Sequence, residues 1–244
     1  MSSQIAAIVE LLASARSVAV LTGSGVSAES GIPTFRDAQT GLWARFRPEE
    51  LATPEAFQRN PRLVWEWYDS RRQTVRAAQP NAGHQALAAL QRRFSSFTLI
   101  TQNVDGLHQR AGSQDVLELH GNILRSKCFK ENIVRDVDDS DADVPPRCTR
   151  CGALMRPDVV WFGEALPTEA LKLAMHAAQH CDVFLSIGTS ALVYPAAELP
   201  HTALAAGAKL VEINRDPTPL SAHAHQSLQG KAGDILPRIV EALG

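Results

Sequence analysis

Short apolar runs and longer amphipathic stretches follow one another along most of the chain. The apolar runs are rich in valine, isoleucine and leucine, as in strands buried on both faces of a parallel sheet; they cover 18–21, 97–101, 116–121, 182–187 and 209–214. Apolar residues recur at helical spacing over 5–12, 84–93, 168–180 and 235–243. This alternation predicts an α/β fold with a Rossmann-like parallel sheet and helices on both faces.

Two segments interrupt the alternation and predict a smaller inserted lobe. Segment 37–79 is rich in aromatic residues, and both Thr53-Pro54 and Asn60-Pro61 resemble an N-cap followed by a first-turn proline, so we expect at least two helices there. Segment 125–160 holds three of the four cysteines and an acidic run that is typical of a solvated loop. We therefore expect a main domain of 1–36, 80–124 and 161–244, and a small lobe of 37–79 and 125–160.

Composition narrows the class of protein. The net charge is −2 at pH 7, which provides no basic surface for nucleic acid or for an acidic membrane. No apolar run approaches the ~20 residues that span a bilayer, and residues 1–12 lack the basic start of a signal peptide. Four cysteines in such a chain do not form a disulfide scaffold. We expect a cytoplasmic monomer with no nucleic-acid or membrane partner.

Polar loops follow four of the predicted strands and form the candidate ligand site. In the first loop, Gly23 and Gly25 allow tight turns that bring backbone N–H groups to a phosphate, and residues 26–30 are expected to open a helix towards the same anion. The spacing departs from the usual dinucleotide fingerprint, because Ala28 stands where a third glycine is common. Such turns also occur for purely structural reasons. Parallel sheets bind ligands at the carboxyl ends of their strands, so the four loops together, 22–31, 101–108, 188–190 and 214–216, indicate a nucleotide site.

Six motifs, in order along residues 18–235, resemble those of the sirtuins, a family of NAD-dependent protein-lysine deacylases. Residues 23–36 are similar to the family's NAD loop, 101–105 to its ribose and nicotinamide motif, and Leu119-His120-Gly121 to its catalytic histidine motif. The other three are 156–164, 188–190 and 214–216. Ser24 departs from the family's usual alanine, but a serine fits there and can donate a hydrogen bond.

The resemblance implies that NAD is consumed as a co-substrate and that the products are nicotinamide, O-acyl-ADP-ribose and free lysine. His120 is implied as the base, which suits an imidazole, while Asn103 would hold the ribose and Asp105 the nicotinamide amide. Phe35 would shield the reactive face of the ribose. If the motif is set aside, His120 is interpreted as a core histidine, and Asn103 and Asp105 as ordinary turn residues. The residues implied in NAD binding are Gly23, Ser24, Gly25, Ala28, Glu29, Thr34, Phe35, Arg36, Trp43, Gln102, Asn103, Val104, Asp105, Gly188, Thr189, Ser190, Asn214, Arg215, Asp216 and Ala232.

The resemblance also implies that an acyl-lysine peptide adds as a strand between two extended edges. Such a strand is recognised mainly through its backbone, so we expect many protein substrates and a loose sequence preference. The implied contact residues are Val160, Trp161, Phe162, Gly163 and Glu164 on one edge and Val193 and Tyr194 on the other.

The aromatic-rich segment indicates which acyl group is removed. Tyr68 and Arg71 share a helix face, and a tyrosine hydroxyl beside an arginine can bind a carboxylate. The pair resembles that of class III sirtuins, which remove succinyl, malonyl and glutaryl groups as well as acetyl, and Ala52 matches the small residue that widens their acyl pocket. The plainer interpretation is an exposed arginine beside a packed tyrosine. A desolvated pair worth ~2–3 kcal/mol would favour succinyl over acetyl by about tenfold to a hundredfold.

The cysteines leave the question of zinc open. The small lobe of the family usually holds structural zinc on two cysteine pairs, which would make this part zinc-ribbon-like. Cys148 and Cys151 form one pair at ligand spacing, but Cys128 has Glu131 where its partner is expected. Zinc could be held by three thiolates with Glu131 or water, or it could be lost, and the broken pair slightly favours no tightly held zinc. Cys181 is expected to be a small buried hydrophobe.

Three alternatives to a class III deacylase follow from the same residues. The first is an acetyl-preferring deacetylase, and the second is a domain of this fold that binds NAD without turnover. The combination of His120, Asn103 and Asp105 argues against the second. The third is protein ADP-ribosylation, which shares NAD cleavage and would transfer labelled ADP-ribose to protein.

Overall fold

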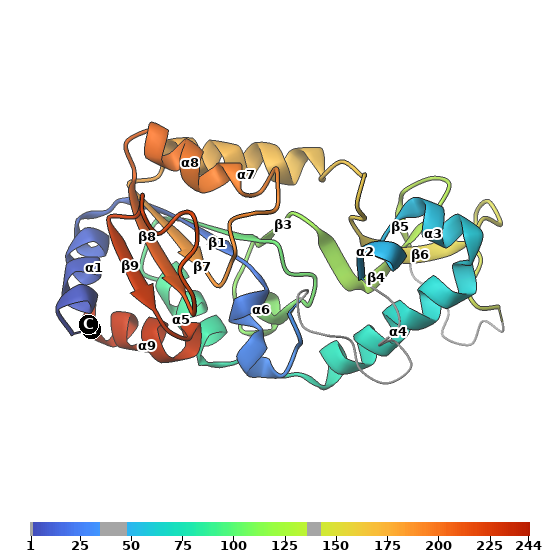
Figure 1. The fold of residues 1–244 in the computed structure, drawn as a ribbon, viewed down its shortest axis with the longest axis horizontal. Coiled ribbons are helices and arrows are strands. Elements are labelled where there is room, and N and C mark those ends of the chain that lie inside the picture. Colours follow the sequence, from blue (N-terminus) through green and yellow to red (C-terminus); the bar gives the residue numbers. More distant parts are fainter. Residues whose placement is uncertain (1, 35–47, 136–142) are drawn as a thin grey trace.

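The computed structural model describes residues 2–34, 48–135 and 143–244. Within these residues, the larger sheet has six strands in the order β3-β2-β1-β7-β8-β9, and all neighbouring pairs are parallel. This confirms the predicted parallel α/β fold (Figure 1). The strands are β1 (Ser17–Thr22), β2 (Ser96–Thr101), β3 (Leu117–Glu118), β7 (Val183–Ile187), β8 (Lys209–Asn214) and β9 (Gln226–Gln229).

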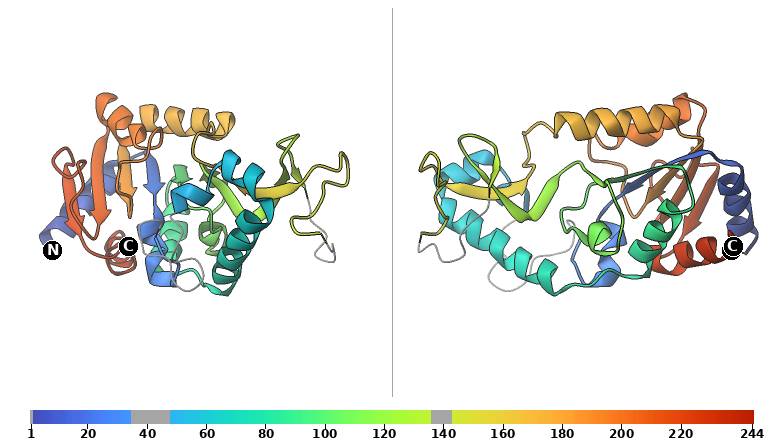
Figure 2. Two further views of the ribbon diagram at one scale, coloured as in Figure 1. Left: turned by 45° about the vertical axis from the view of Figure 1, so that its right-hand side comes forward. Right: turned by 180° about the vertical axis from the view of Figure 1, so that it is seen from behind.

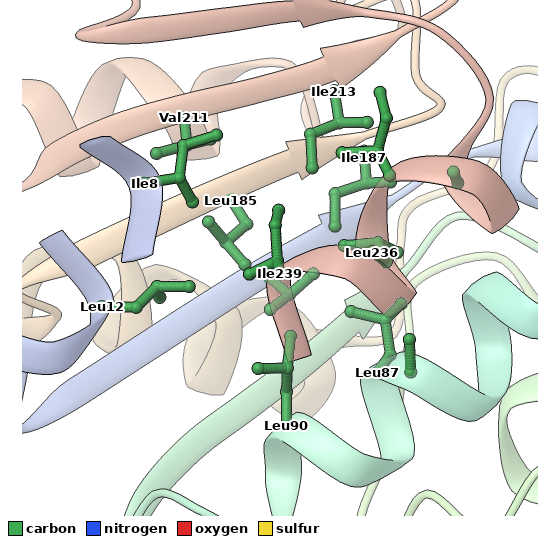
Figure 3. Packing of buried hydrophobic residues seen from close by; sticks show 14 of the residues in the cluster. Ile8, Leu12, Leu87, Leu90, Leu185, Ile187, Val211, Ile213, Leu236 and Ile239 are labelled. Atoms are coloured by element: carbon green, nitrogen blue, oxygen red, sulfur yellow. The ribbon is translucent and has the colours of Figure 1, made fainter. Parts of the chain in front are cut away.

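Helices cover both faces of this sheet, as Figures 1 and 2 show. One face packs against α1 (Ser2–Ser14), α5 (Ala82–Gln91) and α9 (Ala232–Ala242), and the other against α7 (Thr168–His180) and α8 (Glu198–Ala205). Figure 3 shows Ile8, Leu87 and Leu236 from the first set of helices meeting Leu185 and Val211 from the strands. Burial on both faces explains why the strands read as continuous apolar runs. No helix in the described part of the chain is long and apolar enough to cross a bilayer.

The register of the strands brings their carboxyl ends level with one another. Thr22 at the end of β1 pairs with Thr101 of β2 and with Ile187 of β7, and Ile187 pairs with Ile213 of β8. The residues that follow the strands therefore leave the sheet at one edge, where ligands bind in folds of this kind.

A second group of elements lies at the far end of the molecule from α1 and β9 (Figure 1). Its antiparallel sheet has the order β5-β4-β6, and its helices share a core that includes Phe57, Trp67 and Trp161. The predicted caps are confirmed, since Thr53 Oγ1 accepts from Ala56 N at 3.1 Å and Asn60 Oδ1 from Leu63 N at 3.1 Å. The elements are α2 (Pro48–Leu51), α3 (Pro54–Arg59), α4 (Pro61–Ala77), β4 (Gly121–Cys128), β5 (Val134–Arg135) and β6 (Met155–Val159). The domain boundaries themselves remain a prediction.

The loop after β1 differs from the expected helix opening at 26–30. It forms two short 3-10 turns, η1 (Ser24–Val26) and η2 (Ala28–Ser30). The carbonyl of Val26 accepts instead from the side chain of Asn81 at 2.8 Å, and Gly31, with φ of 79°, ends the second turn. The side chain of Asn81, the N-cap of α5, thus takes the place of a backbone donor that a longer helix would supply to Val26 O.

Candidate active site

The loop after β1 packs closely against the loop after β7. Gly25 N–H donates to Gly188 O at 2.8 Å. A Cβ on Gly23 or Gly25 would come within 2.8 Å of the same oxygen, so neither position accepts a side chain without a shift of the backbone. Glycine-rich loops bring backbone N–H groups to a phosphate through close approaches of this kind.

Asn103 and Asp105 lie at the carboxyl end of β2 and are both buried. Asn103 Nδ2 donates to Gly23 O and to Ser27 Oγ, each at 3.1 Å. Asp105 Oδ2 accepts from Ser27 Oγ at 2.7 Å, and Oδ1 accepts from Leu107 N at 2.9 Å. Burial raises the pKa of Asp105, while the bonds from Leu107 and Ser27 act against that rise. Ser27 therefore joins the two predicted residues in one hydrogen-bond network.

Two buried histidines extend this network and were not assigned to the site from the sequence. His84 Nδ1 accepts from Asn81 N at 3.3 Å, so Nε2 carries the proton and faces Ser27 Oγ at 3.4 Å. The ring centre of His84 lies 4.9 Å from that of His108. His108 Nε2 lies 2.9 Å from Thr22 Oγ1, and its Nδ1 has no partner within the described residues.

Burial determines the charge of both histidines. It lowers the pKa of His84 to about 4 and that of His108 to about 3, with a smaller contribution from the charge of His84 to the latter. Both rings are therefore neutral at pH 7. The sequence predicted a helix that starts at about His84, but nothing in it showed that Ser27 lies against this histidine, because that contact forms only when the chain folds.

His120 lies between β3 and β4, where the two sheets meet. Its Nδ1 is 2.9 Å from the carbonyl oxygen of Gln102. A carbonyl only accepts, so Nδ1 carries the proton and Nε2 is left as the basic nitrogen. Burial lowers the pKa of His120, and the weaker effect of the bond to Gln102 raises it. The next residue, Gly121, has φ of 79°, and a Cβ there would lie 2.1 Å from Asp158 O, so the turn after the histidine requires glycine.

The other predicted NAD-binding residues lie on the loops at the same edge of the sheet. Gln102 Nε2 donates to Thr189 Oγ1 at 2.9 Å and so joins the ends of β2 and β7. Glu29 Oε2 accepts from Gly233 N at 2.9 Å, in the first turn of α9 beside Ala232. Asn214 Nδ2 donates to Asp216 O at 2.9 Å. Ser24, Ala28, Thr34, Val104, Ser190 and Arg215 lie on these loops too, whereas Phe35, Arg36 and Trp43 lie outside the described residues.

Tyr68 and Arg71 lie next to each other on α4. Tyr68 is buried and its Oη accepts from Trp161 Nε1 at 2.9 Å. Burial raises the pKa of Tyr68 to about 12 against the opposing charge of Arg71. Arg71 is half-buried, its Cζ lies 5.1 Å from the ring centre of Trp67, and burial lowers its pKa. No carboxylate of the described residues forms an ion pair with it. Ala52 is buried in the same cluster.

The first predicted peptide edge, segment 160–164, is fixed by hydrogen bonds to the rest of the protein. In segment 160–164, Val160 N donates to His120 O at 2.9 Å and Phe162 N to Ala52 O at 3.0 Å. The carboxylate of Glu164 binds Arg156 through two bonds, of 2.5 and 2.8 Å, and accepts from Trp161 N at 2.8 Å. Both its oxygens are therefore engaged within the protein. The large apolar side chains exposed on the edges are Phe162, Leu192, Val193 and Tyr194, whereas the Trp161 ring is buried.

Cys128, Glu131, Cys148 and Cys151 come together beside the antiparallel sheet. Their ligand atoms all lie within 4.8 Å of one another, and Cys128 Sγ is 3.5 Å from Cys151 Sγ. Zinc–sulfur bonds of about 2.3 Å place tetrahedral sulfurs at about this separation, so the donor set could hold zinc. Glu131 is also paired with Arg135 and Arg150, each at 3.3 Å. Cys181 lies elsewhere, in the apolar core under α7, as expected.

The chain is similar to known proteins in both sequence and structure. The model of the Sir2 family matches residues 23–195. The NAD-dependent protein deacylase 2 of Pyrobaculum aerophilum is 53% identical over 96% of this chain and 94% of its own length, and the NAD-dependent protein deacylase of Aquifex aeolicus is 52% identical over 93% and 95%. A solved complex of a Sir2 homologue with NAD is 47% identical and superposes with a TM-score of 0.91 over 98% of this chain and 93% of that one. A Sir2 complex with a p53 peptide and NAD+ is 33% identical, with a TM-score of 0.86 over 97% of each chain.

These similarities cover nearly the whole chain and include the loops that carry Asn103, Asp105 and His120. NAD is the co-substrate, and most of the residues predicted to bind it lie on the loops after β1, β2, β7 and β8. The chain belongs to the Sir2 family and is an NAD-dependent protein deacylase.

Proposed function

We propose that this deacylase removes succinyl and malonyl groups, as well as acetyl groups, from lysine side chains of proteins. The observation that carries the proposal is the half-buried Arg71 beside the hydroxyl of Tyr68, with no described carboxylate paired to it. An arginine stays charged at neutral pH even where burial lowers its pKa. A guanidinium that is partly removed from water and lacks an anionic partner is suited to bind an anionic ligand.

The proposed pocket distinguishes acyl groups by charge. The terminal carboxylate of a succinyl group can accept from the Arg71 guanidinium and from the Tyr68 hydroxyl, which keeps its proton at pH 7 because burial raises its pKa to about 12. An acetyl group offers no such acceptor. We propose that the small side chain of Ala52, which belongs to the same buried cluster, admits the longer acyl chain.

The proposed catalytic roles follow from the polarity of each side chain. His120 acts as the base through Nε2, since Nδ1 is bonded to Gln102 O. Asn103 uses its Nδ2 within the protein, so its Oδ1 is the group that accepts from a ribose hydroxyl. Asp105 holds the nicotinamide amide. When bound, NAD supplies the ribose carbon to which the acyl oxygen is transferred as nicotinamide leaves.

The acyl-lysine peptide is proposed to lie between segment 160–164 and segment 191–194. The first segment is fixed by its bonds to His120 O and Ala52 O, and the complex of a Sir2 relative with a p53 peptide supports a peptide substrate. Because Glu164 is engaged by Arg156, we assign the segment's contact with substrate to its backbone and to the exposed Phe162. We further propose that the protein is a cytoplasmic monomer, with no nucleic-acid or membrane partner.

Kinetics with matched peptides test the acyl preference. We would measure kcat/KM, with NAD, for one peptide sequence carrying succinyl-lysine, malonyl-lysine or acetyl-lysine, and identify the products by mass. Arg71→Met should lower kcat/KM for the succinyl peptide by about tenfold to a hundredfold, because it removes the charge-assisted hydrogen bonds to the carboxylate. The acetyl peptide should be affected much less. Arg62→Met, at an exposed position on the same helix, is the matched control.

The same assay separates the alternatives. Good deacetylation with no desuccinylation would leave an acetyl-preferring enzyme and refute the carboxylate pocket. Transfer of labelled ADP-ribose to protein, without release of free lysine, would point to ADP-ribosylation instead.

A further inference from the structure

The indole ring of Trp161 is buried among residues of three elements, α3, α4 and β6. It is 2% exposed, its centre lies 5.4 Å from that of Phe57 and 6.4 Å from that of Tyr68, and Arg156 Cζ lies 3.3 Å from its centre on the ring face. A peptide on the nearby edge can therefore reach the backbone of Trp161 but not its ring. The ring's polar atom is left with one partner, the hydroxyl of Tyr68, at 2.9 Å.

The direction of this hydrogen bond is unambiguous. An indole N–H can only donate, so the oxygen of Tyr68 must accept. A phenolic proton prefers the plane of its ring and has two orientations there, one on each side of the C–O bond. Because Trp161 Nε1–H occupies one side of the oxygen, the Tyr68 proton is directed to the other side.

The position of Trp161 is itself fixed by an ion pair. Arg156 is 3% exposed, stacks on the indole and binds both oxygens of Glu164, and Glu164 accepts from the backbone N–H of Trp161. Ring and backbone are thus held by the same two residues. Arg156 also donates to Val159 O at 2.7 Å, which joins the arrangement to the end of β6.

We propose that Trp161 is a specificity-determining positioning residue, which acts through Tyr68: its indole N–H aims the tyrosine hydroxyl at the carboxylate of an acidic acyl group. The inference rests on the proposed removal of succinyl and malonyl groups. It adds that the acyl pocket depends on a residue that does not touch the acyl group, and that the segment which binds the peptide backbone also orients the pocket.

A double-mutant cycle tests the inference. The readout is the ratio of kcat/KM for the succinyl peptide to that for the acetyl peptide, so a general loss of activity cancels. Tyr68→Phe should lower this ratio by about tenfold. Trp161→Phe, which removes the indole N–H and keeps an aromatic ring, should lower it by about threefold to tenfold, and the double variant should match Tyr68→Phe alone because the tryptophan has no other route to the acyl group.

The outcomes separate the inference from the proposed function. If Tyr68→Phe and Arg71→Met both leave the ratio unchanged, the carboxylate pocket fails and the inference fails with it. If those variants lower the ratio but Trp161→Phe does not, the pocket stands and the inference is overturned. Additive losses from Trp161→Phe and Tyr68→Phe would also overturn it, since they would show that Trp161 acts independently of the tyrosine.

A spectroscopic measurement covers the case in which Trp161→Phe does not fold. The chain has two tyrosines, Tyr68 and Tyr194, so carbon-13 labelling at the tyrosine Cζ gives two signals that Tyr194→Phe assigns. Binding of the succinyl peptide should shift the Tyr68 signal, and the acetyl peptide should not. The indole N–H signal of Trp161 should move in Tyr68→Phe, which removes its acceptor, and should keep the shift of a hydrogen-bonded indole when the succinyl peptide binds. If the succinyl peptide moves that signal to its position in Tyr68→Phe, Trp161 has released the hydroxyl and the inference is wrong.

Discussion

His120 shows how a single hydrogen bond selects a chemical role. The bond from Nδ1 to the Gln102 carbonyl fixes the tautomer, and the register of β2 and β3 puts that carbonyl in place. Burial favours the neutral ring more strongly than the carbonyl favours the charged one, so the pKa lies below its ordinary value of 6.5. At pH 7 the imidazole is therefore ready to accept a proton.

The pH dependence of turnover should reflect this lowered pKa. Protonation of His120 would remove the proposed base, so kcat/KM should fall on the acid side with a midpoint below pH 6.5 and stay level from that pH to about 8. The profile would be measured with the acetyl and the succinyl peptide, with folding checked at each pH. His120→Ala should abolish turnover, whereas His176→Ala, at an exposed position on α7, should leave the profile unchanged. A midpoint above 6.5 would contradict the assignment.

Elements with strong local signals were predicted closely, and elements without them were missed. Helix α7 spans Thr168–His180 and strand β8 spans Lys209–Asn214, both as the apolar spacing predicts. Strand β9 is polar at three of its four residues and lies at the edge of the sheet, so it carries no apolar run to reveal it. Helix α8 has Pro200 in its first turn, which hides it among loop residues.

In the candidate site too, residues with a local sequence signal were predicted and residues without one were missed. Asn103, Asp105 and His120 stand at strand ends, and strand ends can be read from the sequence. Ser27 and His84 act through side-chain bonds between residues 57 positions apart, which no local pattern encodes. The ion pair between Glu164 and Arg156 also appears only in the fold, because it joins a strand residue to the loop that follows the strand.

The cysteine cluster connects the end of β4, at Cys128, to the loop before β6, which carries Cys148 and Cys151. Glu131 supplies a carboxylate where a thiolate would be softer, and Arg135 and Arg150 compete for it. We expect the protein to take up one zinc or cobalt ion and to lose it to a chelator at least tenfold faster than Glu131→Cys. Cobalt absorption bands from sulfur ligands would report binding directly.

Metal binding can also be measured without an activity assay, through the thermal stability of the protein. Thermal unfolding should shift to higher temperature with zinc, and by more in Glu131→Cys than in the natural sequence, since binding to the folded state stabilises it. Failure of the natural sequence to bind either ion would show that the cluster is held by packing alone.

At the scale of the whole molecule, the buried pair His84 and His108 links stability to pH. In the unfolded chain each histidine takes up a proton below pH 6.5, whereas the folded protein resists protonation until about pH 4 for His84 and about pH 3 for His108. Stability should therefore be constant above pH 7 and fall as the pH drops from 6.5 towards 4, by about 1.4 kcal/mol per pH unit for each histidine.

Chemical denaturation between pH 4 and 8 would measure this dependence. The raised pKa of Asp105 acts in the opposite sense, so the comparison with a His84→Gln, His108→Gln double variant is the decisive one. That variant should lose most of the slope, while His201→Gln, at an exposed position on α8, should keep it. Equal slopes in all three proteins would mean that the buried pair does not control acid stability.

The central proposal for the whole molecule is that Arg71 and Tyr68 form an acyl pocket that recognises a negative charge. The most direct measurement compares two substrates on the unmodified enzyme: a succinyl-lysine peptide and its neutral amide of the same size. The kcat/KM for the succinyl peptide should exceed that for the amide by about tenfold to a hundredfold, because Arg71 and Tyr68 bind the carboxylate. Equal values for the two peptides would contradict it.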